Sequence, residues 1–109
     1  MTTDDFREIA LSFPEAIESA HMNHPDFRVG KKIFATLGNS GKDSACVMLT
    51  PADQLFFVKE HPAAFEPLKG GWGRGGATQV NLKKATKTVA RKALKAAWAM
   101  RAPKTLLAG

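Results

Sequence analysis

The hydrophobic positions at the start of the chain follow the spacing of a helix. Apolar side chains lie three or four residues apart and so form one stripe along a helix axis. The residues of this stripe are Phe6, Ile9, Ala10 and Phe13. The pattern predicts a helix over residues 4–12. Thr3 is the expected N-cap, because its hydroxyl can accept a free backbone N–H, and Pro14 stops the helix because its ring blocks continuation.

A longer amphipathic pattern near the C-terminus predicts a helix from Thr86 to Arg101, closed by Pro103. Alanine is abundant in this segment and favours helix. Its packing face consists of Ala90, Leu94, Ala97, Trp98 and Arg101. A row of cations with the same spacing lies on the exposed side: Lys84, Lys87, Arg91 and Lys95, with Lys92 beside them. The tail from Lys104 to Gly109 is expected to be frayed.

The middle of the chain alternates apolar and polar residues, as half-buried strands do. Residues 27–29 and 32–37 flank Gly30-Lys31, which predicts a tight hairpin because glycine supplies the positive φ of a primed turn. Further strands are expected over residues 18–22, 44–49, 65–69 and 77–82, with a turn over 39–43. In the strand 44–49 one face carries Ala45, Val47 and Leu49, and the other carries Cys46 and Met48. The segment therefore predicts an antiparallel meander that can keep one face wet.

A further helix is predicted after Thr50, its N-cap, because Pro51 suits the first helical position and Asp53 the third. His61-Pro62 ends it. The residues expected on its buried side are Leu55, Phe56 and Val58 to Lys59.

The length of 109 residues predicts one domain, 1–109, with a single hydrophobic core. The acidic start of the chain is unlike a signal peptide, and the longest apolar run, residues 55–58, is too short to span a bilayer. A cytoplasmic protein is therefore expected. The lone cysteine, Cys46, excludes an internal disulfide framework and a Cys-rich zinc site, and its apolar strand predicts a buried, inert thiol.

The distribution of charge along the chain says more about function than the overall composition does. The formal net charge is +6, but residues 1–66 carry a net −4 and residues 67–109 a net +10 without one acidic residue. An acid-free basic third attracts polyanions and gains affinity as their counterions are released. The alternative is a solvated face whose cations pair with acids of the first half after folding.

The segment Gly70-Gly71-Trp72-Gly73-Arg74-Gly75-Gly76 carries the candidate chemistry. It does not fit a phosphate-binding P-loop or a dinucleotide fingerprint, because neither a Lys-Ser/Thr pair nor a helix follows. It is expected to be a glycine-rich wing, in which Arg74 grips a phosphate and Trp72 stacks on a base. The alternative is a flexible hairpin whose Trp72 packs on the sheet or on the last helix.

The segment His24 to Leu37 resembles the hairpin of the MmcQ/YjbR family, and so do the opening residues 6–15, the block Trp72 to Leu82 and the closing amphipathic helix. The resemblance covers nearly the whole chain. It implies a CyaY-like (frataxin-like) α+β two-layer sandwich, with an antiparallel sheet and the N- and C-terminal helices on one face. It also implies DNA binding of the "double-wing" type, and it brings no catalytic residue. The acids of the first helix are too few for the iron-binding role of frataxins.

The sequence thus favours a monomeric or weakly dimeric, non-enzymatic domain that binds DNA through phosphate contacts, without a cofactor, a metal or a membrane. The candidate contact residues are Lys69, Trp72, Arg74, Lys84, Lys87, Arg91, Lys95, Arg28, Lys31 and Lys32. His21 and His24 have only Asp26 as a near third ligand, which is too little for zinc. The alternative is a scaffold that binds a protein or a small anion on the exposed sheet face, with His21 and Arg28. A single nucleic-acid surface requires Trp72 and the cations of the last helix to face the same way.

Overall fold

The computed structural model describes residues 1–38 and 41–107, so part of the turn predicted at 39–43, and Ala108 and Gly109 of the tail, lie outside the described residues. The helices are α1 (Thr3–Leu11), α2 (Pro51–Glu60), α3 (Gly70–Arg74), α4 (Lys87–Arg101) and α5 (Lys104–Leu107). The strands are β1 (Ile17–His21), β2 (His24–Val29), β3 (Lys32–Leu37), β4 (Ser44–Met48), β5 (Phe65–Pro67) and β6 (Ala77–Asn81).

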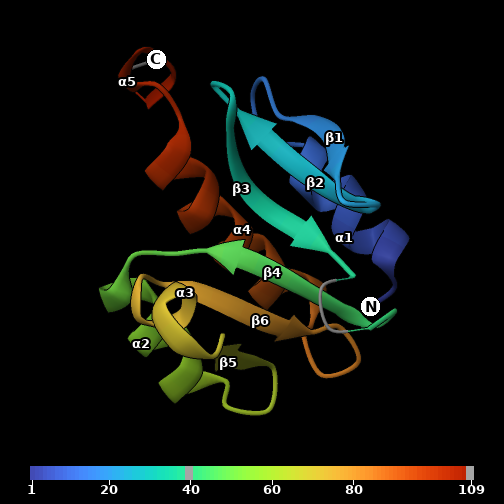
Figure 1. Cartoon of the computed structure of the whole chain (residues 1–109), viewed down its shortest axis with the longest axis vertical. Helices are drawn as coiled ribbons and strands as arrows, with labels where there is room; N and C mark the ends of the chain where they lie inside the picture. The colour runs from blue at the N-terminus through green and yellow to red at the C-terminus, as the bar shows by residue number, and fades with distance from the viewer. Residues whose placement is uncertain (39–40, 108–109) are drawn as a thin grey trace.

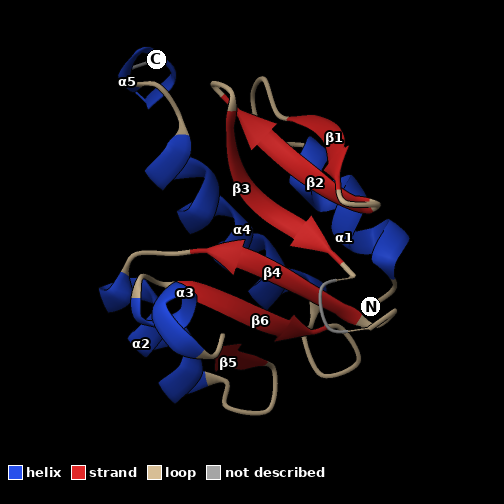
Figure 2. Cartoon of the chain, viewed as in Figure 1, coloured by secondary structure: helices blue, strands red, loops and turns tan. Residues whose placement is uncertain are grey.

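The six strands form one open sheet in the order β1-β2-β3-β4-β6-β5, and each described pair is antiparallel. Helices α1 and α4 lie behind this sheet in Figure 1, whereas the short α3 lies in front of β6. Figure 2 shows the same arrangement coloured by secondary structure, with the strands in front of α1 and α4. The predicted α+β sandwich, with the N- and C-terminal helices on one face of an antiparallel sheet, is confirmed.

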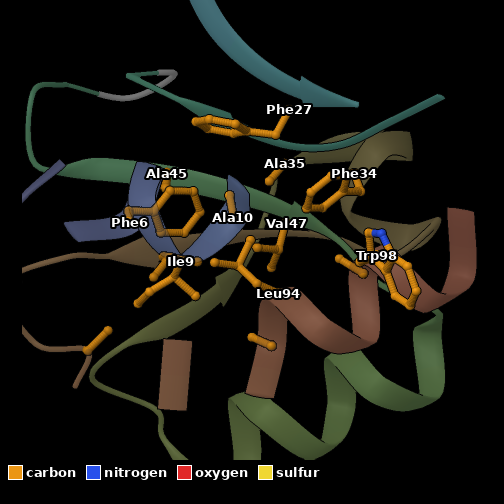
Figure 3. Close-up of a cluster of buried hydrophobic side chains, with 14 of the residues drawn as sticks. Phe6, Ile9, Ala10, Phe27, Phe34, Ala35, Ala45, Val47, Leu94 and Trp98 are labelled. Atoms are coloured by element: carbon orange, nitrogen blue, oxygen red, sulfur yellow. The ribbon is translucent and has the colours of Figure 1, made fainter. Parts of the chain in front are cut away.

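The core lies between the sheet and the helices α1 and α4 (Figure 3). Phe6 of α1 meets Phe27 of β2 edge to face, with 6.1 Å between ring centroids. Trp98 of α4 stacks on Phe13 at 6.0 Å, and its Nε1 donates to the carbonyl of Pro14 at 3.0 Å. The predicted packing face of α4 is confirmed at Ala90, Leu94, Ala97 and Trp98, all of which are buried. Burial of such large side chains is the main stabilising contribution to the fold.

The β2–β3 hairpin is formed as predicted, with positive φ at both turn residues, 56° at Gly30 and 69° at Lys31. A β-bulge follows it. Phe27 pairs with Ala35 but Arg28 pairs with Ile33, which leaves Phe34 as the extra residue of β3. The bulge changes which side chains point into the core: the two adjacent residues Phe34 and Ala35 are both fully buried there. Ile33 and Thr36 lie on the opposite face of the sheet.

Helix α2 begins as predicted, because the Thr50 hydroxyl accepts the N–H of Asp53 at 3.1 Å. The predicted buried side is confirmed at Val58, which is partly buried against the core, and is wrong at Leu55, Phe56 and Lys59. Leu55 and Phe56 are 69% and 56% exposed, and Phe57 is the residue that packs inward, 5.3 Å from the ring of Phe65 on β5. The helix has apolar residues on several sides, so periodicity could not select the side that meets the sheet edge.

Smaller differences occur at element ends. The N-cap of α1 is Thr2 rather than Thr3, in a reciprocal capping box with Asp5. The strand predicted over 65–69 is limited to Phe65–Pro67. The tail is not frayed over Lys104–Leu107, which form a short helix, because Pro103 starts a new turn and its carbonyl accepts the N–H of Leu106 at 2.9 Å.

Candidate functional site

A groove lies on the open face of the sheet, opposite α1 and α4, and encloses about 610 Å³. We call it the open-face groove. Strand alternation produces it: Ala45 and Val47 of β4 point into the core, whereas Cys46 and Met48, between and beyond them, line the groove. The predicted assignment of the two faces of this strand is confirmed.

One wall of the open-face groove is cationic. Its four cations are Arg28, Lys31, Lys32 and Arg101, and no carboxylate is among the described lining residues. The first three come from the β2–β3 hairpin. Arg101 enters from the end of α4, because the next proline, Pro103, lies against the hairpin turn: a side-chain carbon built at Gly30 would come within 2.9 Å of its ring.

The guanidinium of Arg101 is incompletely paired. Its Nε–H is buried and has no hydrogen-bond partner in the part of the chain that the structure describes. A buried N–H without an acceptor costs about 1–3 kcal/mol. Because this nitrogen is itself shielded from solvent, Arg101 contributes its positive charge to the wall and does not offer its Nε–H directly to a ligand in the groove.

The floor and the opposite wall are apolar, with Ile33, Met48 and Leu68 lining the groove beside Trp72. Trp72 belongs to helix α3, and its side chain is 74% exposed. Helix α3 is held in place by Gln54 of α2, whose amide nitrogen donates to the carbonyls of Gly73 at 2.8 Å and Ala77 at 3.1 Å. An exposed indole on a fixed turn offers a flat surface to a ligand without first having to be ordered.

The glycine-rich segment thus forms a helical turn at Gly70–Arg74, which is neither the wing nor the flexible hairpin that the sequence suggests. The N–H of Gly75 bonds to the carbonyl of Gly71 at 3.0 Å, as in an α-helix. Glycine is a poor helix former, so composition disfavours this element, and tertiary contacts create it. The alternative placement of Trp72, packed on the sheet or on the last helix, is excluded by its exposure.

A buried carboxylate organises the cationic wall. Asp26 is fully shielded from solvent and receives two hydrogen bonds from Arg28, Nε to Oδ1 at 2.7 Å and Nη2 to Oδ2 at 3.0 Å. His21 Nδ1 lies 2.7 Å from Asp26 Oδ2. The Arg28 hydrogen bonds, helped by His21, hold the pKa of Asp26 below its ordinary value, against the raising effect of burial. Asp26 therefore fixes the orientation of both groove residues.

The stability of the protein is expected to fall as acid protonates Asp26. A carboxyl with a lowered pKa in the folded state contributes stability above its unfolded value, 3.8, and loses it as the pH falls through the lower folded value. Urea denaturation of the wild type and Asp26→Asn across this range measures the effect. The Asp26→Asn substitution should lower stability most near neutral pH and little in acid. A constant difference between the two proteins at every pH would contradict the assignment.

Cys46 is buried in the groove floor, and desolvation raises the pKa of its thiol to about 11. A thiol with such a pKa is almost wholly protonated at neutral pH and is a poor nucleophile. The buried environment predicted for Cys46 is confirmed.

Two cations of the predicted row on the last helix, Lys87 and Arg91, lie on the other side of the sheet. Lys87 Nζ lies 3.5 Å from Asp5 Oδ1 of α1, and Arg91 Nη1 donates to Ser12 Oγ at 3.3 Å. The structure therefore does not bring these two residues together with Trp72. Helices α1 and α4 cover one face of the sheet, and the open-face groove with Trp72 lies on the other. Pairing with an acid of the first half, the alternative drawn from the charge pattern, is found at Lys87 and at Lys83, whose Nζ lies 3.6 Å from Asp43 Oδ2.

The remaining candidate residues divide between the two sides. Arg28, Lys31, Lys32 and Trp72 line the open-face groove. Lys69 and Arg74 are exposed at the two ends of α3, beside Trp72. Lys84, before α4, borders a small hollow near Pro62 and Val89, and Lys95 is exposed on α4.

Two residues of the candidate site were not identified as such from the sequence. Arg101 was assigned to the packing face of the last helix, and Asp26 was weighed only as a metal ligand. The spacing of Asp26 and Arg28, two residues apart on one strand, places both on the same face and was a usable signal. Arg101 gave no such signal, since its role depends on where α4 ends relative to the hairpin. Among the described residues, no group of three or more His, Cys, Asp or Glu side chains gathers as metal ligands do.

Comparison with known proteins agrees with the fold. The YjbR family model matches residues 11–100. The crystal structure of Deinococcus radiodurans protein DR2400, a DUF419 domain, superposes with a TM-score of 0.75 at 16% identity, over 91% of this chain and 77% of that one. No curated protein matches the sequence. Within the described ranges, no helix has the length and apolar character needed to cross a membrane.

Proposed function

The chain belongs to the YjbR family, and within that fold we propose that it binds nucleic acid through the open-face groove. One observation carries the proposal: among the described residues, four cations and no acid line a groove whose far wall is the exposed ring of Trp72. DNA binding is also what the resemblance to MmcQ/YjbR proteins implies. The proposed role is binding and not catalysis.

The chemistry of the groove suits a phosphate chain. Lysine and arginine neutralise phosphates and release their counterions, which gives affinity without sequence preference. An arginine guanidinium can hold a phosphate with two parallel hydrogen bonds. Arg28 is held by Asp26 through Nε and Nη2, whereas Nη1 makes no bond to that carboxylate and can still donate to a ligand.

The contact surface that we propose is smaller than the one drawn from the sequence. It keeps Arg28, Lys31, Lys32 and Trp72, adds Arg101, and extends along α3 to Lys69 and Arg74. The row on α4 is left out, because Lys87 and Arg91 are engaged with α1 on the opposite face.

Amide chemical shifts of the isotope-labelled protein, titrated with DNA at low salt, test the proposal. Duplex DNA and one of its separated strands are titrated in turn. The largest shifts are expected in residues 31–33, 46–48 and 69–74, and they should shrink as salt is added. Shifts confined to residues 84–95, or no shift with either form at low salt, would overturn it.

A further inference from the structure

The open-face groove has the size of a small-molecule site. Its volume of about 610 Å³ lies within the roughly 300–1,000 Å³ of ordinary ligand pockets. Building on the proposed function, we infer that the groove seats one unpaired nucleotide, with its base stacked on Trp72 and its phosphate among the hairpin cations and Arg101. The ligand class is thus a nucleotide with a free base face, either within a single strand or as a free nucleoside phosphate.

The order of the strands places the cations and the aromatic ring at opposite ends of the open-face groove. Lys31 and Lys32 lie on the β2–β3 hairpin, and α3 with Trp72 lies over β6. Strand β4 runs between β3 and β6 and supplies Met48 to the floor. A ligand that spans the groove therefore meets cations at one end and an aromatic ring at the other, with an apolar floor between them. A nucleotide has the matching division into phosphate, sugar and base.

The exposed ring of Trp72 favours an unpaired base over a base pair. An aromatic side chain stacks on the flat face of a base, and within a duplex both faces are already covered by the neighbouring pairs. The ring also borders a recess and does not project from a convex surface. A single base can enter the recess, whereas a double helix can touch only its rim.

The positive charges of Arg101, Lys31 and Lys32 define the phosphate end of the groove. The Nε–H of Arg101 is buried, whereas Lys31 and Lys32 are exposed. A phosphate between these side chains therefore meets three positive charges and can accept hydrogen bonds from the two lysines. No carboxylate among the described lining residues competes for them.

Three ligands of equal length separate the contributions to binding: a dye-labelled oligothymidine, the same phosphodiester chain without bases, and a duplex. Fluorescence anisotropy at one fixed salt concentration gives each affinity. The wild type is expected to bind oligothymidine roughly 5- to 150-fold more tightly than the abasic chain, which is the range one stacked base contributes. The duplex should also bind more weakly than oligothymidine.

Trp72→Ala should remove this difference, so that oligothymidine and the abasic chain bind alike, whereas Trp72→Phe should keep part of it. Trp72 is 74% exposed and makes no described hydrogen bond through its side chain, so neither change threatens the fold. Equal affinities of the wild type for all three ligands would overturn the inference and leave the proposed function standing. Failure to bind any of them would remove the proposed function itself.

Tryptophan emission distinguishes the two sources of the nucleotide. The chain has two tryptophans, and Trp98 is buried, so quenching by an added nucleotide reports on Trp72. Quenching by thymidine monophosphate in the wild type, absent in Trp72→Ala, would assign the seat to free nucleotides as well as strands. Quenching by oligothymidine alone would assign it to strands.

Discussion

Gly76→Ala is expected to lower the free energy of unfolding by about 4 kcal/mol or more. Single substitutions seldom cost this much, and those that do have a specific structural cause such as a steric clash with the backbone. A side-chain carbon at this position would lie 1.8 Å from the carbonyl oxygen of Leu49 and 2.8 Å from its carbon. Both are backbone atoms at the junction of β4 and α2, so they cannot move aside as a flexible side chain could. The φ of +112° adds a further cost for any residue with a side chain.

The contact at Gly76 also aligns two elements of the groove. Its carbonyl accepts the N–H of Leu49 at 3.2 Å and the Thr78 hydroxyl at 2.9 Å. Displacement of Gly76 therefore shifts α3, and Trp72 with it, relative to β4. Loss of nucleic-acid binding is expected to accompany the loss of stability.

Gly71→Ala is the matched control, because it makes the same substitution five residues earlier in the same glycine-rich segment. The nearest atom to the added carbon is the Arg74 Nη2 at 3.8 Å, an ordinary contact, and Gly71 lies within α3. Alanine is a better helix former than glycine, so stability should change by less than about 1 kcal/mol. Urea denaturation of the two variants measures the contrast. Similar midpoints would show that the Gly76 contact is not tight.

The regular elements were predictable because their signals are local. Helix α4 combines a three-and-four spacing of apolar residues with a Thr86 cap and a closing Pro103, and each of these acts within a few residues. The β2–β3 hairpin follows from a glycine that can adopt positive φ next to two alternating strands. The resemblance to MmcQ/YjbR proteins then supplied the arrangement of layers, which no local pattern contains.

The site was harder to predict because it depends on contacts between distant residues. The bulge at Phe34 decides that Ile33 and Thr36 share the open face, and nothing in the alternation of β3 indicates an extra residue. Helix α3 forms in a glycine-rich segment through its contact with Gln54, 19 residues earlier than Gly73. The sequence therefore identified Trp72 as a candidate without indicating the element that carries it.

The α4 cations show the limit of charge patterns. Their regular spacing correctly predicted an exposed helix side, but spacing within one helix does not say what lies next to it. Helix α1 brings Asp5 and Ser12 beside Lys87 and Arg91. The basic third of the chain is consequently divided between two faces of the sheet, and only one of them also holds Trp72.

Reversing the charge of the hairpin lysines is expected to abolish most nucleic-acid binding. Lys31→Glu with Lys32→Glu replaces two attractions to phosphate by two repulsions inside the open-face groove, and Asp26 already adds a negative charge beneath Arg28. A tenfold loss of affinity corresponds to about 1.4 kcal/mol of binding free energy. Reversing the charge of two contacts should cost more than this amount. Both lysines are exposed, so the fold should survive.

The matched control is Lys92→Glu with Lys95→Glu, which changes the net charge equally on the exposed side of α4. At physiological ionic strength the Debye length is about 8 Å, so charges on the far face act only weakly on a ligand in the groove. The decisive measurement is the affinity of both double variants for one oligonucleotide under these conditions. We expect at least a tenfold loss of affinity for the hairpin variant and less than about a threefold loss for the α4 variant. The reverse order, or equal losses, would contradict this expectation.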